Sequence, residues 1–212
     1  MRTFGVLTAL IGAASFTGPA PVFGRTSLPA AFADSLPPFH AFGIPPFADT
    51  GKAVPTHDGS HDFDFNVGTW RTHIQILQHP LSGSIAWTKM EGTVTIRKIW
   101  DGQGQVEDIQ ADGPGGHLAG LTVYLYNPQS KQWSQTFASK DSGILETPII
   151  GEFKNGRGEL FGLDAVDGRR VLVRGLWSAI TPNSHKFEQA YSADGGKTWE
   201  TNFIGTLERL KP

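Results

Sequence analysis

The chain has 212 residues and a formal net charge of −2, with charged side chains spread along the sequence and no basic block. Because phosphate binding requires clustered Lys and Arg, this pattern argues against a nucleic-acid partner. The chain also contains no cysteine, which excludes disulfides, thiolate metal sites and cysteine nucleophiles.

The N-terminus has the pattern of a secretory signal. Arg2 precedes a mostly apolar run from Phe4 to Phe16, and Ala31-Phe32-Ala33 provides a small-residue cleavage site. The run is too short to cross a hydrocarbon core of about 30 Å, so no transmembrane span is expected. We therefore expect residues 1–33 to be a signal peptide cleaved after Ala33, and the mature protein to be periplasmic or secreted. A disordered apolar tail or an uncleaved anchor is the alternative.

Residues 34–60 have the composition of a Pro/Gly-rich linker, since repeated prolines disfavour both helix and ladder. Near its end, His57, His61, Asp62 and Asp64 form a cluster that could bind Zn²⁺ if it were helical. Pro55 and Gly59 argue against a helix there. The sequence therefore favours solvated chain over a metal site.

From Phe63 onward, alternating apolar and polar residues predict an all-β domain over residues 61–212. A short helical turn within 59–65 could close one end of it, and the second strand is long enough to be bent or interrupted near Gly92. The predicted strands are 69–77, 85–100, 105–111, 118–126, 132–138, 149–154, 158–165, 170–177, 186–192 and 198–208.

Five tight-turn signals connect these strands. Asn-Gly and Asp-Gly pairs supply the positive φ angles of hairpin turns, so each joins strands that are neighbours in space. The signals are Asp101-Gly102, Asn127-Pro128, Asn155-Gly156, Asp167-Gly168 and Asp194-Gly195-Gly196. Recurring at hairpin spacing, they predict an antiparallel up-and-down β-barrel of about ten strands, and a closed barrel has an interior.

Gly68-Thr69-Trp70 on the first strand resembles the G-x-W signature of lipocalin-like, or calycin, barrels. That resemblance implies that Trp70 packs across the closed end of the barrel beneath a basic residue of the last strand, for which Arg209 is the candidate. Nitrobindin-type haem barrels begin similarly but continue into further glycines, whereas Arg71-Thr72-His73 follows here. No haem or other cofactor is expected.

The resemblance extends from Phe63 to Arg209. Phe63-Asp64-Phe65, Val67 to Trp70, the segment from Gly115 to Leu121, and Phe187 to Asn202 are similar to a bacterial domain family of unknown function. This likeness implies a calycin-like barrel and no particular activity.

The last turn, Ser192 to Trp199, matches the Asp-box pattern S-x-D-x-G-x-T-W, best known from sialidases. Its chemistry is local, because the carboxylate accepts backbone N–H groups and the glycines take unusual φ angles. We therefore expect structural roles for Asp194, Gly196 and Trp199, and no glycosidase activity.

Polar residues inside predicted strands are the candidates for interior chemistry. His73 faces opposite to Trp70 and, if Trp70 packs outside or at the end, points into the cavity as a ligand contact or general base. Asp108 is a second candidate base. Arg174 and Glu188, on successive strands, could form an inward pair that positions a carboxylate or carbonyl, or an outward solvated pair. Further candidate ligand contacts are Tyr124, Trp133 and Asn202.

These features favour a barrel that binds a small apolar or aromatic molecule in an interior cavity of a few hundred Å³. One alternative is a cofactor-independent isomerase, lyase or hydrolase, with His73 or Asp108 as base and Arg174 holding an oxyanion. Another is a packed barrel that serves as an interaction module and exposes apolar patches. The sequence predicts no particular oligomeric state.

Overall fold

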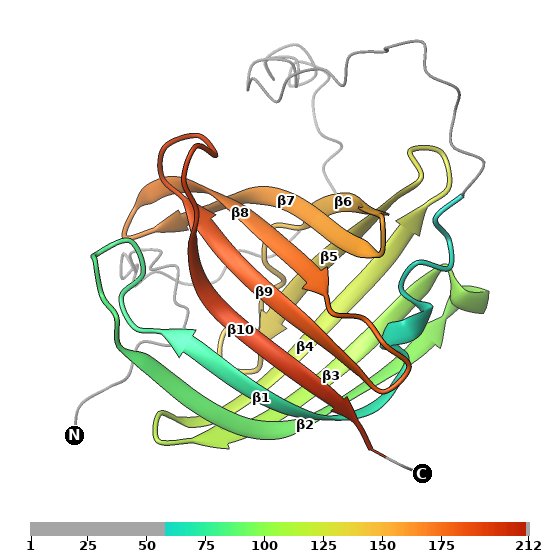
Figure 1. Cartoon of the computed structure of the whole chain (residues 1–212), viewed down its shortest axis with the longest axis horizontal. Helices are drawn as coiled ribbons and strands as arrows, with labels where there is room; N and C mark the ends of the chain where they lie inside the picture. Colours follow the sequence, from blue (N-terminus) through green and yellow to red (C-terminus); the bar gives the residue numbers. More distant parts are fainter. Residues whose placement is uncertain (1–57, 211–212) are drawn as a thin grey trace, which may run out of the picture. The chain divides into compact units, whose positions relative to one another are not determined.

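The computed structural model describes residues 58–210, and their strands form one closed antiparallel barrel (Figure 1). The signal peptide, its cleavage site and the linker up to residue 57 lie outside the described residues. The strands are β1 (Gly68–Leu77), β2 (Trp87–Ile99), β3 (Gly104–Gly113), β4 (Gly116–Asn127), β5 (Gln132–Ser139), β6 (Ile149–Lys154), β7 (Arg157–Val166), β8 (Arg169–Ser178), β9 (Ser184–Ser192) and β10 (Glu200–Arg209). None of the helical segments within 58–210 has the length and apolar character of a membrane-spanning helix.

Each strand pairs with the next along the chain, and β1 pairs with β10 to close the ring. The predicted turns lie between the strands that they were expected to join. Asn155 and Gly156 connect β6 to β7 with φ angles of 53° and 73°, as a primed hairpin turn requires. The predicted ten-strand up-and-down barrel is therefore confirmed.

The second strand is continuous past Gly92, where the sequence had suggested a bend or an interruption, so the interruption does not occur. A Cβ atom at Gly92 would lie 2.0 Å from the Gln110 carbonyl oxygen on β3. This glycine permits close approach of two backbones and does not interrupt the strand.

The segment before β1 fills one end of the barrel. It contains the short 3-10 helix η3 (Asp64–Asn66), which overlaps the end of the helical turn predicted within 59–65. The Phe63 ring is fully buried and lies 4.8–5.1 Å, centroid to centroid, from the rings of Tyr124, Trp133, Phe153 and Trp177.

Side chains from the barrel wall hold this segment through its carbonyl groups. The Trp133 indole donates to the Gly59 carbonyl at 2.8 Å, and the Gln105 amide donates to the Phe63 carbonyl at 2.9 Å. The last residues of the predicted linker thus contribute to closing the barrel. We call residues 59–67 the plug.

The G-x-W start of β1 belongs to the same closed end. The Arg209 guanidinium lies 3.9 Å from the centre of the buried Trp70 ring, as the calycin resemblance implied. It also donates to the carbonyls of Val67 at 2.9 Å and Phe65 at 3.1 Å. Gly68 has a φ of 136°, and a Cβ atom there would lie 2.3 Å from Arg209 Nη1, so the glycine makes room for the arginine.

The Asp-box turn between β9 and β10 is held by local hydrogen bonds. Asp194 Oδ1 accepts the backbone N–H groups of Lys197 at 3.0 Å and Thr198 at 2.9 Å. Hydrogen bonds from Thr198 and Ser192 hold the pKa of the Asp194 carboxyl well below its usual range. The Trp199 indole donates to the Gly196 carbonyl at 3.1 Å. These contacts are those of a structural hairpin.

Candidate functional site

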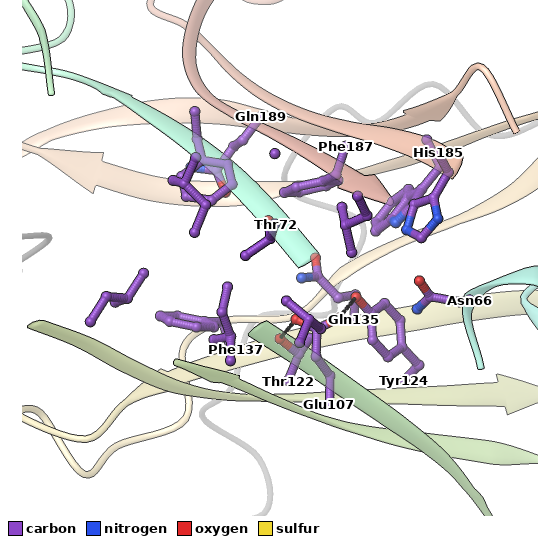
Figure 2. A pocket seen from close by; sticks show the side chains of 18 of the residues that line it. Asn66, Thr72, Glu107, Thr122, Tyr124, Gln135, Phe137, His185, Phe187 and Gln189 are labelled. Carbon is purple, nitrogen blue, oxygen red and sulfur yellow. Dashed lines mark hydrogen bonds between the residues drawn. The ribbon is translucent and has the colours of Figure 1, made fainter. Parts of the chain in front are cut away.

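The interior of the barrel contains a cavity of about 110 Å³ (Figure 2). Its wall is mostly apolar, with side chains from strands around the whole ring, including Ile74, Val94, Ile109 and Leu118. The volume is smaller than the few hundred Å³ expected from the sequence. Large interior rings account for the difference, since Phe137, Trp177, Phe187 and Phe203 all project into the space.

A hydrogen-bonded carboxyl group lies on one wall of this cavity. Glu107 on β3 is directly opposite Thr122 on β4, and its Oε1 accepts the Thr122 hydroxyl at 2.9 Å. Its Oε2 accepts the Tyr124 hydroxyl at 3.0 Å, and Figure 2 shows both bonds. Alternation along β4 places Thr122 and Tyr124 on the same inner face.

Burial sets the protonation of this group. It raises the pKa of Glu107, while the Thr122 and Tyr124 hydrogen bonds act in the opposite direction. Burial, followed by the Glu107 charge and hydrogen bond, raises the pKa of Tyr124 well above its ordinary value, and the Asn66 amide opposes that rise. Tyr124 therefore remains a hydrogen-bond donor at neutral pH.

Two further polar side chains reach the cavity from the closed end. Asn66 belongs to the plug and His185 to β9, and both line the cavity. Asn66 Nδ2 and His185 Nδ1 are buried and have no hydrogen-bond partner among the described residues. Burial, with a smaller contribution from Arg209, lowers the pKa of His185 to about 4, so its ring is neutral at physiological pH.

A smaller cavity of about 40 Å³ borders the first and shares Gln135, Phe137, Glu146 and Gln189 with it. Although Glu146 as a whole residue is exposed, its side chain lines both spaces. Burial and the nearby Asp164 charge raise its pKa to about 7.

The charges around these spaces have one sign. The first cavity is lined by the carboxyl groups of Glu107 and Glu146, and the second by those of Glu146 and Asp164. No Lys or Arg is among the described residues that line either space. The interior can therefore accept hydrogen bonds or a positive charge, but it offers no cation to an anionic group.

His73 and Asp108, the predicted bases, face away from this interior. Trp70 is buried inside the barrel, so alternation turns His73 outward, where it forms an ion pair with Glu91. Asp108 is exposed and accepts a hydrogen bond from Gln110 at 2.7 Å. The prediction that His73 points into the cavity is wrong, because Trp70 occupies the inner face of β1 at the closed end and alternation then turns His73 outward. Asp108 likewise faces solvent, from the outer face of β3.

Arg174 and Glu188 also face outward and are not partners. The Arg174 guanidinium lies over the Trp199 ring at 4.8 Å, and Glu188 pairs with Lys186 at 2.9 Å. In the register of β8 and β9, Arg174 lies opposite Ala190. Of the two alternatives that the sequence left open, the inward Arg–Glu pair is excluded, and on the outer face the two residues have other partners.

The remaining candidates have three different positions. Tyr124 lines the cavity, and Trp133 is buried against the plug. Asn202 is buried at the bulge of β10, near Tyr191, but does not line the cavity. Contact between these residues and a ligand stays a prediction.

Several interior polar residues were not anticipated, including Glu107, Thr122, Gln135, Glu146 and His185. For Glu107 the sequence did contain a signal, because alternation along β3 places it on the same face as the buried Ile109 and Ala111. Glu146 lies in the connection between β5 and β6, where no periodicity exists to reveal its orientation.

Comparison with known proteins identifies the fold class only. No family model matches the chain, and no curated protein sequence matches it. The predicted bacterial domain family thus has no support beyond the barrel itself.

Solved structures do match. The S-type phycobiliprotein lyase CPES from Guillardia theta aligns with a TM-score of 0.50 and 14% identity, over 71% of this chain and 91% of that protein. The redesigned barrel mFAP0, solved with bound DFHBI, has a TM-score of 0.39 and 12% identity, covering 68% and 99% of the two chains. A de novo designed fluorescence-activating β-barrel has a TM-score of 0.38 and 14% identity, covering 73% and 99%. The chain has the fold of a lipocalin-like barrel.

Proposed function

We propose that the barrel binds a small, largely apolar molecule in its interior. The observation that carries the proposal is the combination of an apolar cavity with a few convergent polar groups, the arrangement typical of ligand sites. Unpartnered buried atoms such as Asn66 Nδ2 are costly in an interior without a ligand or water to bind them.

The cavity volume limits the ligand. About 110 Å³ is less than the roughly 300–1,000 Å³ of pockets for drug-sized molecules. It is closer to an engineered cavity of about 150 Å³ that binds benzene. The expected ligand therefore has one ring or a short branched chain, and a larger one requires interior phenylalanines to change rotamer.

An enzyme that uses the predicted residues is not supported. Its base, His73 or Asp108, and its oxyanion-binding group, Arg174, all lie on the outer surface. A binding role needs only the interior features described above.

One observation favours interaction with another molecule as a second role. Ile150 on β6 and Phe161 on β7 are directly opposite each other on the outer face, and Leu163 lies two residues further along β7. All three side chains are about half exposed, as a docking surface would be.

The proposed cellular location rests on the N-terminal sequence. We propose export to the periplasm or medium, with removal of residues 1–33, on the basis of the apolar run and the Ala31-Phe32-Ala33 site. N-terminal sequencing of protein from its own cells should give a chain that begins at Asp34. A chain that begins at Met1 would overturn this proposal.

Binding inside the barrel is tested by filling the cavity. Leu118 lines the cavity, so Leu118→Trp should occupy it and abolish the saturable shifts in amide NMR signals that toluene causes in the wild type. Leu121→Trp is the matched control, because Leu121 lies on the same strand with its side chain 41% exposed outside. The absence of saturable shifts in the wild type, or equal binding by Leu118→Trp, would contradict interior binding.

A further inference from the structure

The chemical class of the ligand can be inferred from the cavity wall, and this inference rests on the proposed interior binding. The interior carries the carboxyl groups of Glu107 and Glu146, and among the described lining residues there is no Lys or Arg to balance them. His185 has a pKa of about 4 and is therefore neutral at physiological pH. A carboxylate or phosphate ligand would meet no opposite charge, and like charges in a buried site repel strongly.

Glu107 is held in position to accept from a ligand. Thr122 donates to one of its oxygens and Tyr124 to the other, so the carboxyl group is fixed in the wall (Figure 2). A carboxylate has about four acceptor positions, and these two hydrogen bonds fill only half of them. The free positions are available to a donor inside the cavity.

A second, independent observation indicates that the cavity receives a polar ligand. The side chains of Asn66 and His185 are only 1% and 3% exposed, and both line the cavity. Asn66 Nδ2 and His185 Nδ1 nevertheless have no hydrogen-bond partner among the described residues. Such atoms are usually satisfied by water or by a bound molecule.

We propose that the ligand is a small primary amine with an apolar body, whose ammonium group donates hydrogen bonds to Glu107 and holds its carboxyl group in the ionised form. The apolar body contacts the side chains around Ile109 and Leu118, and Asn66 and His185 are available to a further polar group on the ligand. Charge-assisted hydrogen bonds are about twice as strong as neutral ones, which offsets the dehydration of the ammonium group.

Three probes of the same size test this assignment. Benzylamine, benzyl alcohol and benzoate share one ring and differ in the charge of their polar group. At pH 7.5, calorimetry should show that the wild-type protein binds benzylamine about ten times more tightly than benzyl alcohol, and benzoate most weakly. Equal binding of the amine and the alcohol, or preference for benzoate, would overturn the proposal.

Two neighbouring residues provide a matched pair of variants. Glu107→Gln removes the interior carboxyl group and should abolish the preference for benzylamine over benzyl alcohol. Asp108→Asn makes the same change on the outer face of the same strand and should leave the preference intact. Loss of the preference in Asp108→Asn, or its persistence in Glu107→Gln, would contradict the role of Glu107.

Glu146→Gln tests whether the other carboxyl group that lines the cavity binds the amine instead. Loss of the amine preference in Glu146→Gln but not in Glu107→Gln would overturn the Glu107 assignment. Failure of this inference remains distinct from failure of interior binding. If no probe binds the wild type, both proposals fail, whereas binding of benzyl alcohol without an amine preference refutes only this one.

Discussion

Neighbouring residues of one barrel strand have opposite surroundings. Glu107 lines the cavity and is hydrogen-bonded to Thr122 and Tyr124, whereas Asp108 is exposed to solvent. Both are acidic and are adjacent in sequence, yet only Glu107 can meet a ligand inside the barrel. At the scale of single residues, the face of the strand on which a side chain lies decides its role more than the residue type does.

His185 should make stability depend on pH. Burial lowers its pKa from 6.5 to about 4, so the unfolded chain gains a proton near pH 6.5 while the folded protein resists protonation. The free energy of unfolding should therefore fall as pH decreases from 7 to 4, with a contribution from His185 of about 3 kcal/mol. Urea denaturation of the wild type and of His185→Gln across this range measures the contribution.

Glutamine does not titrate, so the stability difference between the two proteins isolates the imidazole. Glu146, with a pKa raised to about 7, contributes with the opposite sign, because its contribution to the free energy of unfolding falls as pH rises. It is present in both proteins and cancels in the difference. A difference that stays constant from pH 7 to pH 4 would show that His185 protonates as easily in the folded state as in the unfolded state.

The orientation of His73 shows why sequence alone could not identify the interior site. The sequence correctly placed His73 on the face opposite Trp70, but which face is inside depends on the plug. The Trp70 indole donates to the Asn66 carbonyl of the plug at 2.8 Å, and this contact joins the strand to a segment outside it. Such tertiary contacts leave no periodic signal in a single sequence.

At the scale of elements, strands and turns were predicted well because their signals are local. Alternation and β-branched residues mark the strands, and Asn-Gly or Asp-Gly marks the turns at Asp101-Gly102, Asn155-Gly156, Asp167-Gly168 and Asp194-Gly195. The pairing of β5 with β6, which we call the seam, is different. The connection between these strands, from Lys140 to Pro148, has no such signal and yet brings Glu146 to the cavity.

The turn between β6 and β7 gives a direct test of this local chemistry. Gly156 has a φ of 73° and open space around the position of a Cβ atom, so Gly156→Ala adds backbone strain without a clash. The free energy of unfolding should fall by about 1–2 kcal/mol. Gly115→Ala is the control, because Gly115 lacks a positive φ and its Cβ atom would meet only Thr88 at 3.5 Å.

Urea denaturation of both variants measures the two costs, and the control should remain within about 0.5 kcal/mol of the wild type. Equal costs at Gly156 and Gly115 would mean that the primed turn does not constrain the chain.

At the scale of the whole barrel, the ring of strands is closed, but the length of the pairing differs from one strand pair to another. The register of β2 and β3 runs from Glu91 to Ile99, whereas that of β5 and β6 covers only Trp133 to Gln135. Beyond it, the Glu146 N–H donates to the Phe137 carbonyl at 2.8 Å in place of a regular ladder. Both cavities border this part of the wall, which makes the seam the expected route for a ligand to reach the interior.

Hydrogen exchange should therefore distinguish the seam from the rest of the barrel. Short pairing permits local opening, so amides from Ser134 to Phe137 and from Glu146 to Gly151 should exchange with opening free energies about 2 kcal/mol lower than those of β1 and β2. Exchange measured residue by residue by NMR gives these values. Saturating benzyl alcohol should slow exchange at the seam more than at the turn between β6 and β7, because only the seam borders the occupied cavity. Uniform protection around the ring, or slowing that is equal at both places, would contradict access through the seam.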